Sequence, residues 1–312
     1  MGRVAIVLPT HNRAALLRRA LGSLVAQVPD SPAYPIIVVD NNSTDETRAV
    51  CAEFGGRVQY VGEPRQGLSH ARNAGVAAAA AGRRSDIVAF VDDDIEVTAG
   101  WIEAISRAFA EHPEVDCVGG RVLPAAGGVL PGWLTREHWG PLALQDHGGQ
   151  QRLFDERAPV GLIGANFAFR AEVFERIGGF SIDVQRVKDG IGSTEDHEFL
   201  RRLYAAGGKA LYAPDAVVTT EVPPERMTRR YHRRWHRGHG RFHALMRTPE
   251  VERTRRRLLG IPSHLFRSAL NDAVAWIRLA MSGDAARAFA AETRLWFFSG
   301  FLEGRCGWLI RR

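Results

Sequence analysis

The stretch IVAFVDDD, residues 87–94, decides the fold, because a short apolar run there ends in three consecutive aspartates. An apolar run that is rich in β-branched and aromatic residues is typical of a buried strand. The aspartates therefore follow its C-terminal end, where open α/β sheets bind ligands. A divalent cation that prefers oxygen ligands, Mn²⁺ or Mg²⁺, would offset the repulsion between the three carboxylates. A helix N-cap is the alternative, but capping needs a single aspartate.

The composition is that of an ordinary globular protein. The chain has 312 residues, 45% of them hydrophobic and 24% charged, which allows one large domain or two ordinary ones. The net charge of +6 favours anionic partners such as phosphates, nucleic acid or a membrane surface. The three cysteines are widely spaced and fit a reducing compartment. Since there is no long apolar stretch and no room for a signal peptide before the first expected strand, we expect a cytoplasmic protein.

Strand-like and helix-like patterns alternate through the first part of the chain. Strands are predicted at 4–8, 36–39, 58–61 and 87–91, and amphipathic helices at 13–25, 45–54 and 68–81. This alternation is typical of βαβ units, so the predicted fold class is α/β with a mostly parallel central sheet. Further elements are expected at 101–111 (helix), 115–118 (strand), 165–169 (strand) and 196–206 (helix), with a short helix that ends at Ile177.

Two regions depart from this pattern. Residues 123–157 are irregular and rich in glycine, proline and glutamine, which favours a functional loop, a lid or an acceptor site, over a disordered insertion. After Pro223-Pro224 arginine and histidine dominate residues 226–257, and helical segments with aromatic residues follow. We therefore place a domain boundary here, with one domain at 1–222 and a basic, aromatic, helical region at 223–312.

Polar residues follow the first two expected strands. The first strand is followed by PTHNR (9–13), and the second ends in DNNSTD (40–45). The C-terminal ends of parallel strands meet at one edge of a sheet, so we expect these residues to lie beside the three aspartates.

The motifs LPTHNR, VVDNNSTD, GLSHARNAG, FVDDD, GANFAFR, GGF and TEDHEF occur in an order that resembles the family 2 glycosyltransferases. The resemblance covers roughly residues 3–240. It implies the GT-A fold, with a nucleotide-sugar half at about 1–122 and an acceptor half at about 123–222. It also implies an inverting sugar transfer from a nucleotide-diphosphate donor.

The resemblance implies a role for each matching position on the donor side. Asp40 resembles the carboxylate that accepts a hydrogen bond from the nucleotide base, Asp92 the DXD acid near the ribose, and Asp94 the acid on the metal ion that bridges the diphosphate. Arg13 and Arg72 resemble nucleotide or phosphate contacts, although a surface ion pair for the first and solvent exposure for the second stay open. The predicted donor set is Pro9, Thr10, Asn12, Arg13, Asp40, Asn42, Arg72, Asp92, Asp93 and Arg234.

Glu195 and Asp196 resemble the catalytic pair of the family. Asp196 would be the general base that takes the proton from the acceptor hydroxyl. The same stretch can also start a helix, and the two roles are compatible. Asn166 resembles a residue on the acceptor side, and the neighbouring Gly164 permits a close approach of the backbone.

One position departs from the family pattern. Thr220 stands where many relatives have a histidine that can join the metal site. The metal would then be held by Asp94, the diphosphate and water, with Glu221 as a further candidate.

The segment 231–241 is the densest positive stretch of the chain. Arg234-Trp235 resembles the end of the QxxRW motif of processive relatives, in which the arginine contacts the diphosphate and the tryptophan the acceptor, but Tyr231 replaces the glutamine. We expect at least one of Arg233, Arg234 and Arg237 to meet the diphosphate. Histidine pairs at i,i+4 spacing could bind zinc, but a solvated basic helix is favoured because no HExxH acid accompanies them.

The tail, residues 261–312, interleaves aromatic residues with arginines. This pattern fits a peripheral contact with the inner face of the membrane and a lipid-linked acceptor, and it equally fits packing against the catalytic domain.

Two other classes of function compete with the transferase. A sugar-phosphate nucleotidyltransferase would need a glycine-rich, lysine-bearing loop, but residues 8–13 contain no glycine. A nucleic-acid binder fits the arginines but leaves the aspartates unexplained, since they would repel a phosphate backbone; we expect no nucleic-acid partner. The donor base (UDP, GDP or dTDP) and the acceptor (a sugar, a lipid-linked or a small molecule) stay open.

Overall fold

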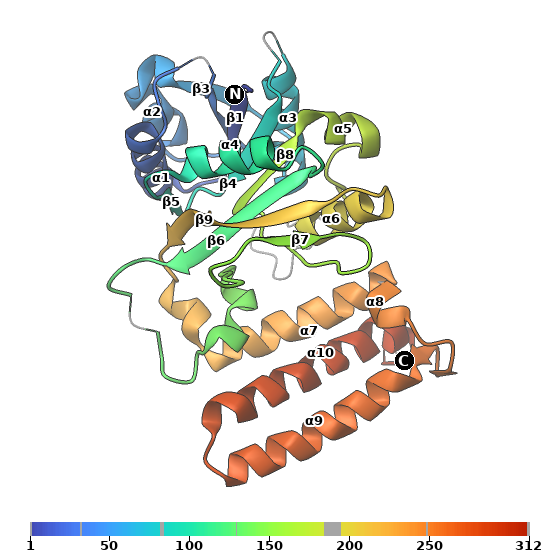
Figure 1. The fold of residues 1–312 in the computed structure, drawn as a ribbon. Helices are drawn as coiled ribbons and strands as arrows, with labels where there is room; N and C mark the ends of the chain where they lie inside the picture. The colour runs from blue at the N-terminus through green and yellow to red at the C-terminus, as the bar shows by residue number, and fades with distance from the viewer. Residues whose placement is uncertain are drawn as a thin grey trace. The chain divides into compact units, whose positions relative to one another are not determined.

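The structure, a computed structural model, describes residues 2–31, 33–81, 84–128, 130–183, 195–247 and 249–310 (Figure 1). The chain forms two compact units. The first combines Met1–Ala126 with Ala143–Glu221 and holds the main sheet. The second combines Gly127–Leu142 with Val222–Arg312 and is mainly helical. Part of the irregular 123–157 segment therefore groups with the C-terminal region, while its end contributes a strand to the sheet.

Four parallel strands form the first half of the sheet. They are β1 (Val4–Thr10), β2 (Ile36–Asp40), β3 (Val58–Gly62) and β4 (Ile87–Val91), in the order β3-β2-β1-β4. Every residue of β1, β2 and β4 is buried, as expected for parallel strands that are covered on both faces. The register pairs Thr10 with Asp40, so β1 and β2 end at the same level.

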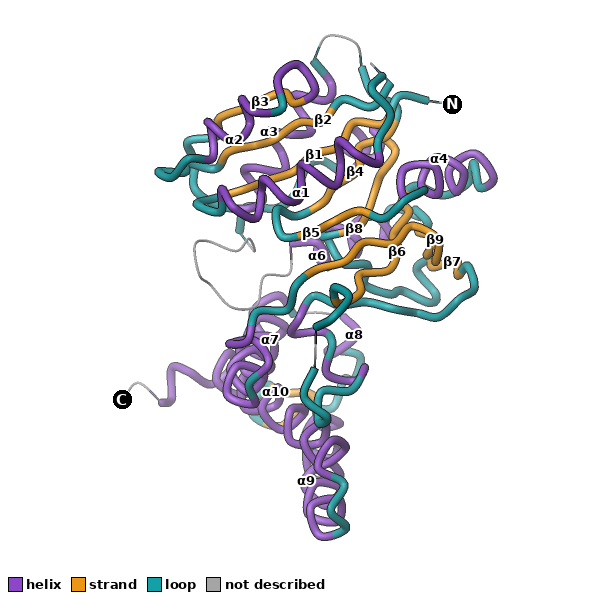
Figure 2. Tube along the Cα trace, turned by 90° about the vertical axis from the view of Figure 1, so that its left-hand side faces the viewer, coloured by secondary structure: helices purple, strands orange, loops and turns teal. Residues whose placement is uncertain are grey.

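The second half of the sheet is mixed. It continues from β4 in the order β8 (Asn166–Arg170), β6 (Cys117–Pro124), β9 (Ala210–Thr220) and β5 (Ile95–Val97), with β7 (Arg152–Phe154) paired to β9 (Figure 2). β8 is antiparallel to β4, and Asn166 pairs with Val91. The chain before β8 therefore lies at the same edge as the aspartates after β4.

Helices cover both faces of the sheet (Figure 2). α3 (Leu68–Ala80), α5 (Ala171–Ile177) and α6 (Glu195–Ala205) pack on one face; α1 (Ala14–Gln27) and α4 (Trp101–Glu111) lie on the other, with α2 (Thr47–Glu53) beside α1. The short turns are η1 (Gly55–Arg57), η2 (Arg136–His138), η3 (Gly140–Leu142) and η4 (Pro224–Met227).

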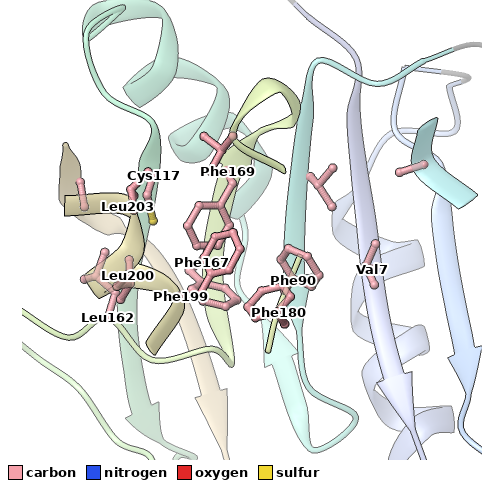
Figure 3. Packing of buried hydrophobic residues seen from close by; sticks show 14 of the residues in the cluster. Val7, Phe90, Cys117, Leu162, Phe167, Phe169, Phe180, Phe199, Leu200 and Leu203 are labelled. Atoms are coloured by element: carbon pink, nitrogen blue, oxygen red, sulfur yellow. The ribbon is translucent and has the colours of Figure 1, made fainter. Parts of the chain in front are cut away.

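Aromatic side chains fill the core beneath α6 (Figure 3). Phe199 stacks on Phe180 with ring centroids 4.4 Å apart, and Phe90 meets Phe167 edge to face at 5.4 Å. Such pairs add to the free energy gained from burial. The cluster holds the N-terminus of α6 against β4 and β8.

The predicted α/β class is confirmed, with corrections in the second half of the sheet. The strand expected at 115–118 begins only at Cys117 and continues to Pro124. The strand expected at 165–169 is present as β8 but runs antiparallel to β4. The three-residue strands β5 and β7 had no separate signal in the sequence.

The second unit is built on three long helices and a small hairpin. Its elements are α7 (Arg229–Met246), α8 (Pro249–Glu252), β10 (Arg257–Leu258), β11 (Ile261–Pro262), α9 (Ser263–Met281) and α10 (Ala285–Ile310). α7 and α10 pack closely at glycines: a Cβ added to Gly300 would lie 1.8 Å from the Arg237 carbonyl oxygen, and one on Gly240 1.9 Å from that of Phe297. No helix in the described ranges is long and apolar enough to cross a membrane.

The histidines of α7 are buried or half-buried. His232 is fully buried, with its ring 5.2 Å from Trp133 and 6.1 Å from Phe289. The prediction of a solvated basic helix is thus wrong for the side of α7 that carries His232. It is confirmed for several arginines of α7, which are exposed. The Nε2 atoms of His239 and His243 lie 3.0 Å apart, but no group of three metal-binding side chains occurs among the described residues. The zinc alternative therefore has no third ligand in that part of the chain.

Candidate functional site

The turns that follow β1 and β2 interlock at the edge of the sheet. Asn12 and Asn42 have left-handed backbones, with φ of 52° and 69°, a conformation that asparagine tolerates better than most residues. The Asn12 side-chain oxygen accepts a hydrogen bond from the Thr44 N–H at 2.7 Å, and the Asn12 N–H donates to Ser43 Oγ at 2.9 Å. Pro9 lies inside β1 and is buried. Asn12 therefore fixes one strand end to the other.

Asp40, the predicted contact to the nucleotide base, is buried at the end of β2. It accepts hydrogen bonds from the Tyr60 hydroxyl (2.7 Å) and the Ser43 N–H (2.9 Å). Burial and the Asp40 carboxylate together raise the pKa of Tyr60 to about 12. A carboxylate has about four lone-pair positions, so these contacts leave acceptor capacity for a ligand.

Asp93 is the buried member of the aspartate triplet. It accepts a hydrogen bond from the Thr10 hydroxyl at 2.8 Å and one from Arg13 at 3.0 Å, while Arg13 also reaches Asp94 at 3.2 Å. Burial is the main reason that the pKa of Asp93 rises to about 6; the positive charge of Arg13 opposes this, and Asp94 and Asp92 add to it. Arg13 thus pairs with the triplet itself.

Arg72 reaches from α3 into the centre of the site. Its side chain is 2% exposed and forms an ion pair with Glu195 at 2.9 Å and with Asp92 at 3.5 Å. The guanidinium also lies over the rings of Phe167 and Phe180, 5.5 and 5.4 Å from their centroids. Solvent exposure, which the sequence left open for Arg72, is excluded.

Gly164 allows this approach. A Cβ added at Gly164 would lie 2.5 Å from Arg72 Nη2, so a side chain there would displace the guanidinium. The Gly164 N–H also donates to Asp196 Oδ2 at 3.2 Å, and the His197 N–H donates to Asp196 Oδ1 at 2.7 Å. Burial raises the pKa of Asp196, with the charge of Arg72 opposing the rise. A proton acceptor is therefore held beside a buried arginine.

We name these residues the strand-edge cluster. They come from the ends of β1 and β4, from α3 and from the start of α6, and the contacts above join them in two groups, one around Arg13 and one around Arg72. The cluster consists of Arg13, Arg72, Asp92, Asp93, Asp94, Glu195 and Asp196.

Asn166 lies inside the sheet. It is 1% exposed; its amide oxygen accepts from Trp101 Nε1 at 2.9 Å, and its amide nitrogen donates to the carbonyls of Arg121 and Ala216, both at 2.8 Å. These bonds join β8, β6, β9 and α4, so the structure gives Asn166 an architectural role. Its predicted place on the acceptor side has no support in these contacts.

Asn41 is a residue that the sequence reasoning did not single out. Its amide donates to the carbonyls of Glu63 and Arg65 at 3.0 and 2.7 Å, and its oxygen accepts from the Gly67 N–H at 2.7 Å. It therefore fixes the loop that opens α3 and carries Arg72. Its position inside the DNNSTD motif could have identified it as a candidate site residue.

The end of β9 offers little to a metal ion. Thr220 is buried, and its hydroxyl donates a long hydrogen bond to the neighbouring Glu221 carbonyl at 3.4 Å. The Glu221 carboxylate pairs with Arg19 at 3.0 Å. Within the described ranges no group of three or more His, Cys, Asp and Glu side chains could by itself hold a metal ion.

Arg234 and Trp235 lie on α7, in the second unit. Of the three arginines expected near the diphosphate, Arg233 pairs with Glu292 at 2.6 Å and Arg237 with Glu303 at 2.9 Å. Arg234 is exposed and has no ion pair within the described ranges. Trp235 stacks on His239 with centroids 4.6 Å apart. The donor and acceptor roles of Arg234 and Trp235 stay predictions.

The fold and the acidic strand ends define a GT-A glycosyltransferase. Residues 5–178 match the family model described as Glycosyl transferase family 2. The chain belongs to this family and is a glycosyltransferase, as the motifs predicted.

The relatives of the chain carry glycosyltransferase names. It is 25% identical over 226 residues to a glucosyl-dolichyl phosphate glucuronosyltransferase of Haloferax volcanii, which covers 70% of this chain and 69% of that protein. It is 28% identical over 221 residues to a pre-mycofactocin glycosyltransferase of Mycobacterium tuberculosis, covering 69% of this chain and 42% of the other. With an uncharacterized glycosyltransferase of the same organism it shares 39% identity over 133 residues, 43% of this chain and 54% of the other. The chain thus spans about half the length of several curated relatives.

Solved structures share the fold. A mannosyltransferase from Pyrobaculum calidifontis in complex with GDP-Man and Mn²⁺ aligns with a TM-score of 0.62 and 20% identity, over 97% of this chain and 87% of that one. GalNAc-T7 with UDP, GalNAc and Mn²⁺ aligns with a TM-score of 0.55 and 18% identity, over 78% and 48%. At these identities the likeness carries the GT-A fold alone.

Proposed function

We propose that this glycosyltransferase inverts the configuration of the sugar that it transfers, with Asp196 as general base and a divalent cation at Asp92 and Asp94. The supporting observation is the position of Arg72. It contacts Asp92 at the end of β4 and Glu195 at the start of α6, so one buried arginine joins a predicted donor acid to one member of the predicted catalytic pair.

The proposed reaction uses Asp196 as a proton acceptor. Its carboxylate takes the proton of an acceptor hydroxyl while that oxygen bonds to the anomeric carbon from the face opposite the diphosphate. The bond between the anomeric carbon and the phosphate oxygen breaks, and the nucleoside diphosphate leaves with the electron pair. The N–H groups of Gly164 and His197 orient the carboxylate. Its raised pKa makes it a stronger base than an ordinary aspartate.

The exposed aspartates fit a cation that takes few ligands from the protein. The Asp92 and Asp94 side chains are 28% and 21% exposed, against 7% for Asp93, so two carboxylates of the triplet reach solvent. Mg²⁺ commonly binds one or two carboxylates together with substrate phosphates and water, and Mn²⁺ also suits oxygen ligands. When bound, the cation would stabilise the negative charge of the departing diphosphate.

We also propose a nucleotide-sugar donor and a hydroxyl acceptor whose identity the geometry leaves open. The name of the Haloferax relative includes a dolichyl phosphate substrate. Together with the arginines and aromatic residues of the tail, this motivates a lipid-linked acceptor and a peripheral contact of the second unit with a membrane. The activity and partners of the whole protein stand as proposals.

Substitution of the base tests the mechanism. Asp196→Asn should retain nucleotide binding and lower transfer by about 10²- to 10⁴-fold, the usual contribution of a positioned acid or base. Asp215→Asn, which changes an exposed aspartate in the same unit, is the control and should transfer normally. Full activity of Asp196→Asn would rule out Asp196 as base.

Thermal unfolding tests the donor and the metal without knowledge of the acceptor. The protein is heated with UDP, GDP or dTDP, with and without Mn²⁺. A nucleotide at about 100 times its dissociation constant adds about 2.7 kcal/mol of stability. We expect one nucleotide to raise the unfolding temperature in a Mn²⁺-dependent way, and Asp94→Asn to remove that dependence. If the nucleotide raised the unfolding temperature equally with and without Mn²⁺, the proposed cation site at Asp92 and Asp94 would be contradicted.

A further inference from the structure

The β10–β11 hairpin of the second unit presents two leucines to solvent. Leu258 and Leu259 are 55% and 75% exposed. Leu259 and Gly260 form the turn, with φ of 52° and 76°. A left-handed backbone is unfavourable for leucine, and strain of this kind persists mainly where function requires it. An apolar side chain is thus held outward at a position that glycine or asparagine would fill at lower cost.

The base of the hairpin is firmly anchored. Ile261, the partner of Leu258 in the ladder, is fully buried with Ala244 and Phe301 in the core of the second unit. The exposure of the leucines is therefore a property of a packed hairpin. The hairpin therefore buries Ile261 at its base and exposes Leu258 and Leu259 at its tip.

Arginines line a cavity beside the tip. A cavity of about 480 Å³ is lined by Arg247, Arg257 and Arg305 together with Leu259 and Gly260. Glu252 pairs with Arg257 and Arg305. Arg247 is exposed and has no acidic partner in the part of the chain that the structure describes. Three arginines thus face one glutamate, so the cavity carries net positive charge that an anion would neutralise. In agreement with this, burial and the nearby charge of Arg247 lower the pKa of Arg305.

Three further arginines precede the hairpin. Arg253, Arg255 and Arg256 are exposed and form no ion pair within the described ranges. Exposed leucines at the tip of an anchored hairpin, with unpaired arginines in the segment that leads into it, complement a surface with negative phosphates above a hydrocarbon layer. A soluble phosphate would use the arginines and leave the leucines without a partner.

We propose that this hairpin is a docking site for an anionic phospholipid surface. Leu258 and Leu259 enter the boundary between headgroups and acyl chains, and Arg247 with its cavity binds a lipid phosphate. The inference rests on the membrane contact put forward in the proposed function and gives it a location. It is independent of the transfer chemistry.

Vesicle sedimentation of the full chain tests the site. We expect binding to vesicles of phosphatidylcholine with 30% phosphatidylglycerol, and much weaker binding to phosphatidylcholine alone. Arg255→Gln with Arg256→Gln should weaken binding roughly 10- to 30-fold, since each arginine near such a surface adds about fivefold or slightly more. Leu258→Ser with Leu259→Ser should weaken it about tenfold or more, because two apolar side chains lose their burial in lipid.

Matched variants separate the hairpin from general attraction. Leu153→Ser changes a leucine that is 47% exposed in the first unit, and Arg230→Gln with Arg241→Gln removes the same charge from α7. Both should bind vesicles like the parent. Equal losses in controls and hairpin variants, or no vesicle binding at all, would overturn the proposal.

Two further outcomes would assign the hairpin to another occupant and also overturn the proposal. One is competition, in which 10 mM inorganic phosphate abolishes vesicle binding. The other is a dimer in light scattering that the leucine variant dissociates. The Mn²⁺-dependent nucleotide shift is measured on the same variants. If no nucleotide raises the unfolding temperature of the parent protein, the result counts against the proposed function. If the nucleotide shift is present but the protein does not bind vesicles, the result counts only against the hairpin as a docking site.

Discussion

Two ion pairs, one in each unit of this glycosyltransferase, lie in opposite environments. In the strand-edge cluster, Arg72 and Glu195 are each 2% exposed and pair out of contact with water. In the second unit, Arg237 and Glu303 pair at a similar distance but are 52% and 35% exposed. Water screens the exposed pair, whereas each buried charge depends on its partner for the solvation that it has lost. Similar contacts should therefore have very different energetic weights.

Removal of Arg72 should have the largest effect. Arg72→Met leaves Glu195 buried without its cation, and breaking a buried pair in this way costs about 3–5 kcal/mol. Arg18→Met is the matched control, because Arg18 pairs with Glu53 at 2.7 Å but both side chains are about half exposed; we expect a much smaller loss of stability, since water screens this pair. Urea unfolding of both variants measures the difference. Equal losses would show that burial does not separate the two kinds of pair.

The burial of Arg72 is a feature that could not be predicted from the sequence. The strands β1 to β4 and the helices α1 to α4 could be predicted, because long apolar periodicities determine them. The acidic strand ends could be placed at one edge for the same reason. Arg72 stands in an alanine-rich helix where no pattern predicts whether it meets water or Glu195, which lies 123 positions away.

Strand direction and short elements were equally hidden. The run Asn166–Arg170 has the pattern of a strand in either direction, so β8 could not be predicted as antiparallel. β5 and β7 have three residues each, too few for a period to appear. The histidine face of α7 was missed because its partners, Trp133 and Phe289, are remote in sequence.

Neutralising Asp93 should have the second largest effect, and it should increase the free energy of unfolding. The pKa of Asp93 in the fold, about 6, lies above its value in the unfolded chain, about 3.9. The folded state therefore binds the proton more tightly, and stability is lost as the pH rises from about 4 to about 6. At pH 7, Asp93→Asn should gain up to about 3 kcal/mol and remove this part of the pH dependence. Urea unfolding between pH 4 and 7 measures it.

Asp45→Asn gives the opposite sign and serves as its control. Although burial opposes the effect, hydrogen bonds from Thr47 and Ala14 hold the pKa of Asp45 below its ordinary value. Its contribution is present above the unfolded pKa and is lost as the pH falls, so the substitution should destabilise the protein at pH 7. If Asp93→Asn also destabilised the protein at pH 7, the Arg13 pair would outweigh the burial of the carboxylate.

A methyl group at Gly164 should have a smaller effect. In Gly164→Ala the new Cβ meets Arg72 Nη2 at 2.5 Å, and because the guanidinium is confined on all sides, overpacking of about 1–3 kcal/mol is expected. Gly22→Ala is the control: nothing lies within 4 Å of its added Cβ, and within α1 alanine should stabilise by about 0.5–1 kcal/mol. Thermal unfolding compares the two. A stable Gly164→Ala would mean that Arg72 can move aside.

The smallest effect is expected for the exposed pair of the second unit. A double-mutant cycle with Arg237→Gln and Glu303→Gln should give a coupling below about 1 kcal/mol, because both side chains keep much of their hydration whether or not they pair. The coupling should decrease further as salt is raised from 0.1 to 1 M, since the Debye length falls from about 10 to 3 Å. The same cycle on Arg72→Met and Glu195→Gln should give a larger coupling that salt changes little. A salt-insensitive coupling of several kcal/mol between Arg237 and Glu303 would remove the distinction between the two pairs, because it would show that neighbouring side chains shield this pair from water as completely as the core shields Arg72.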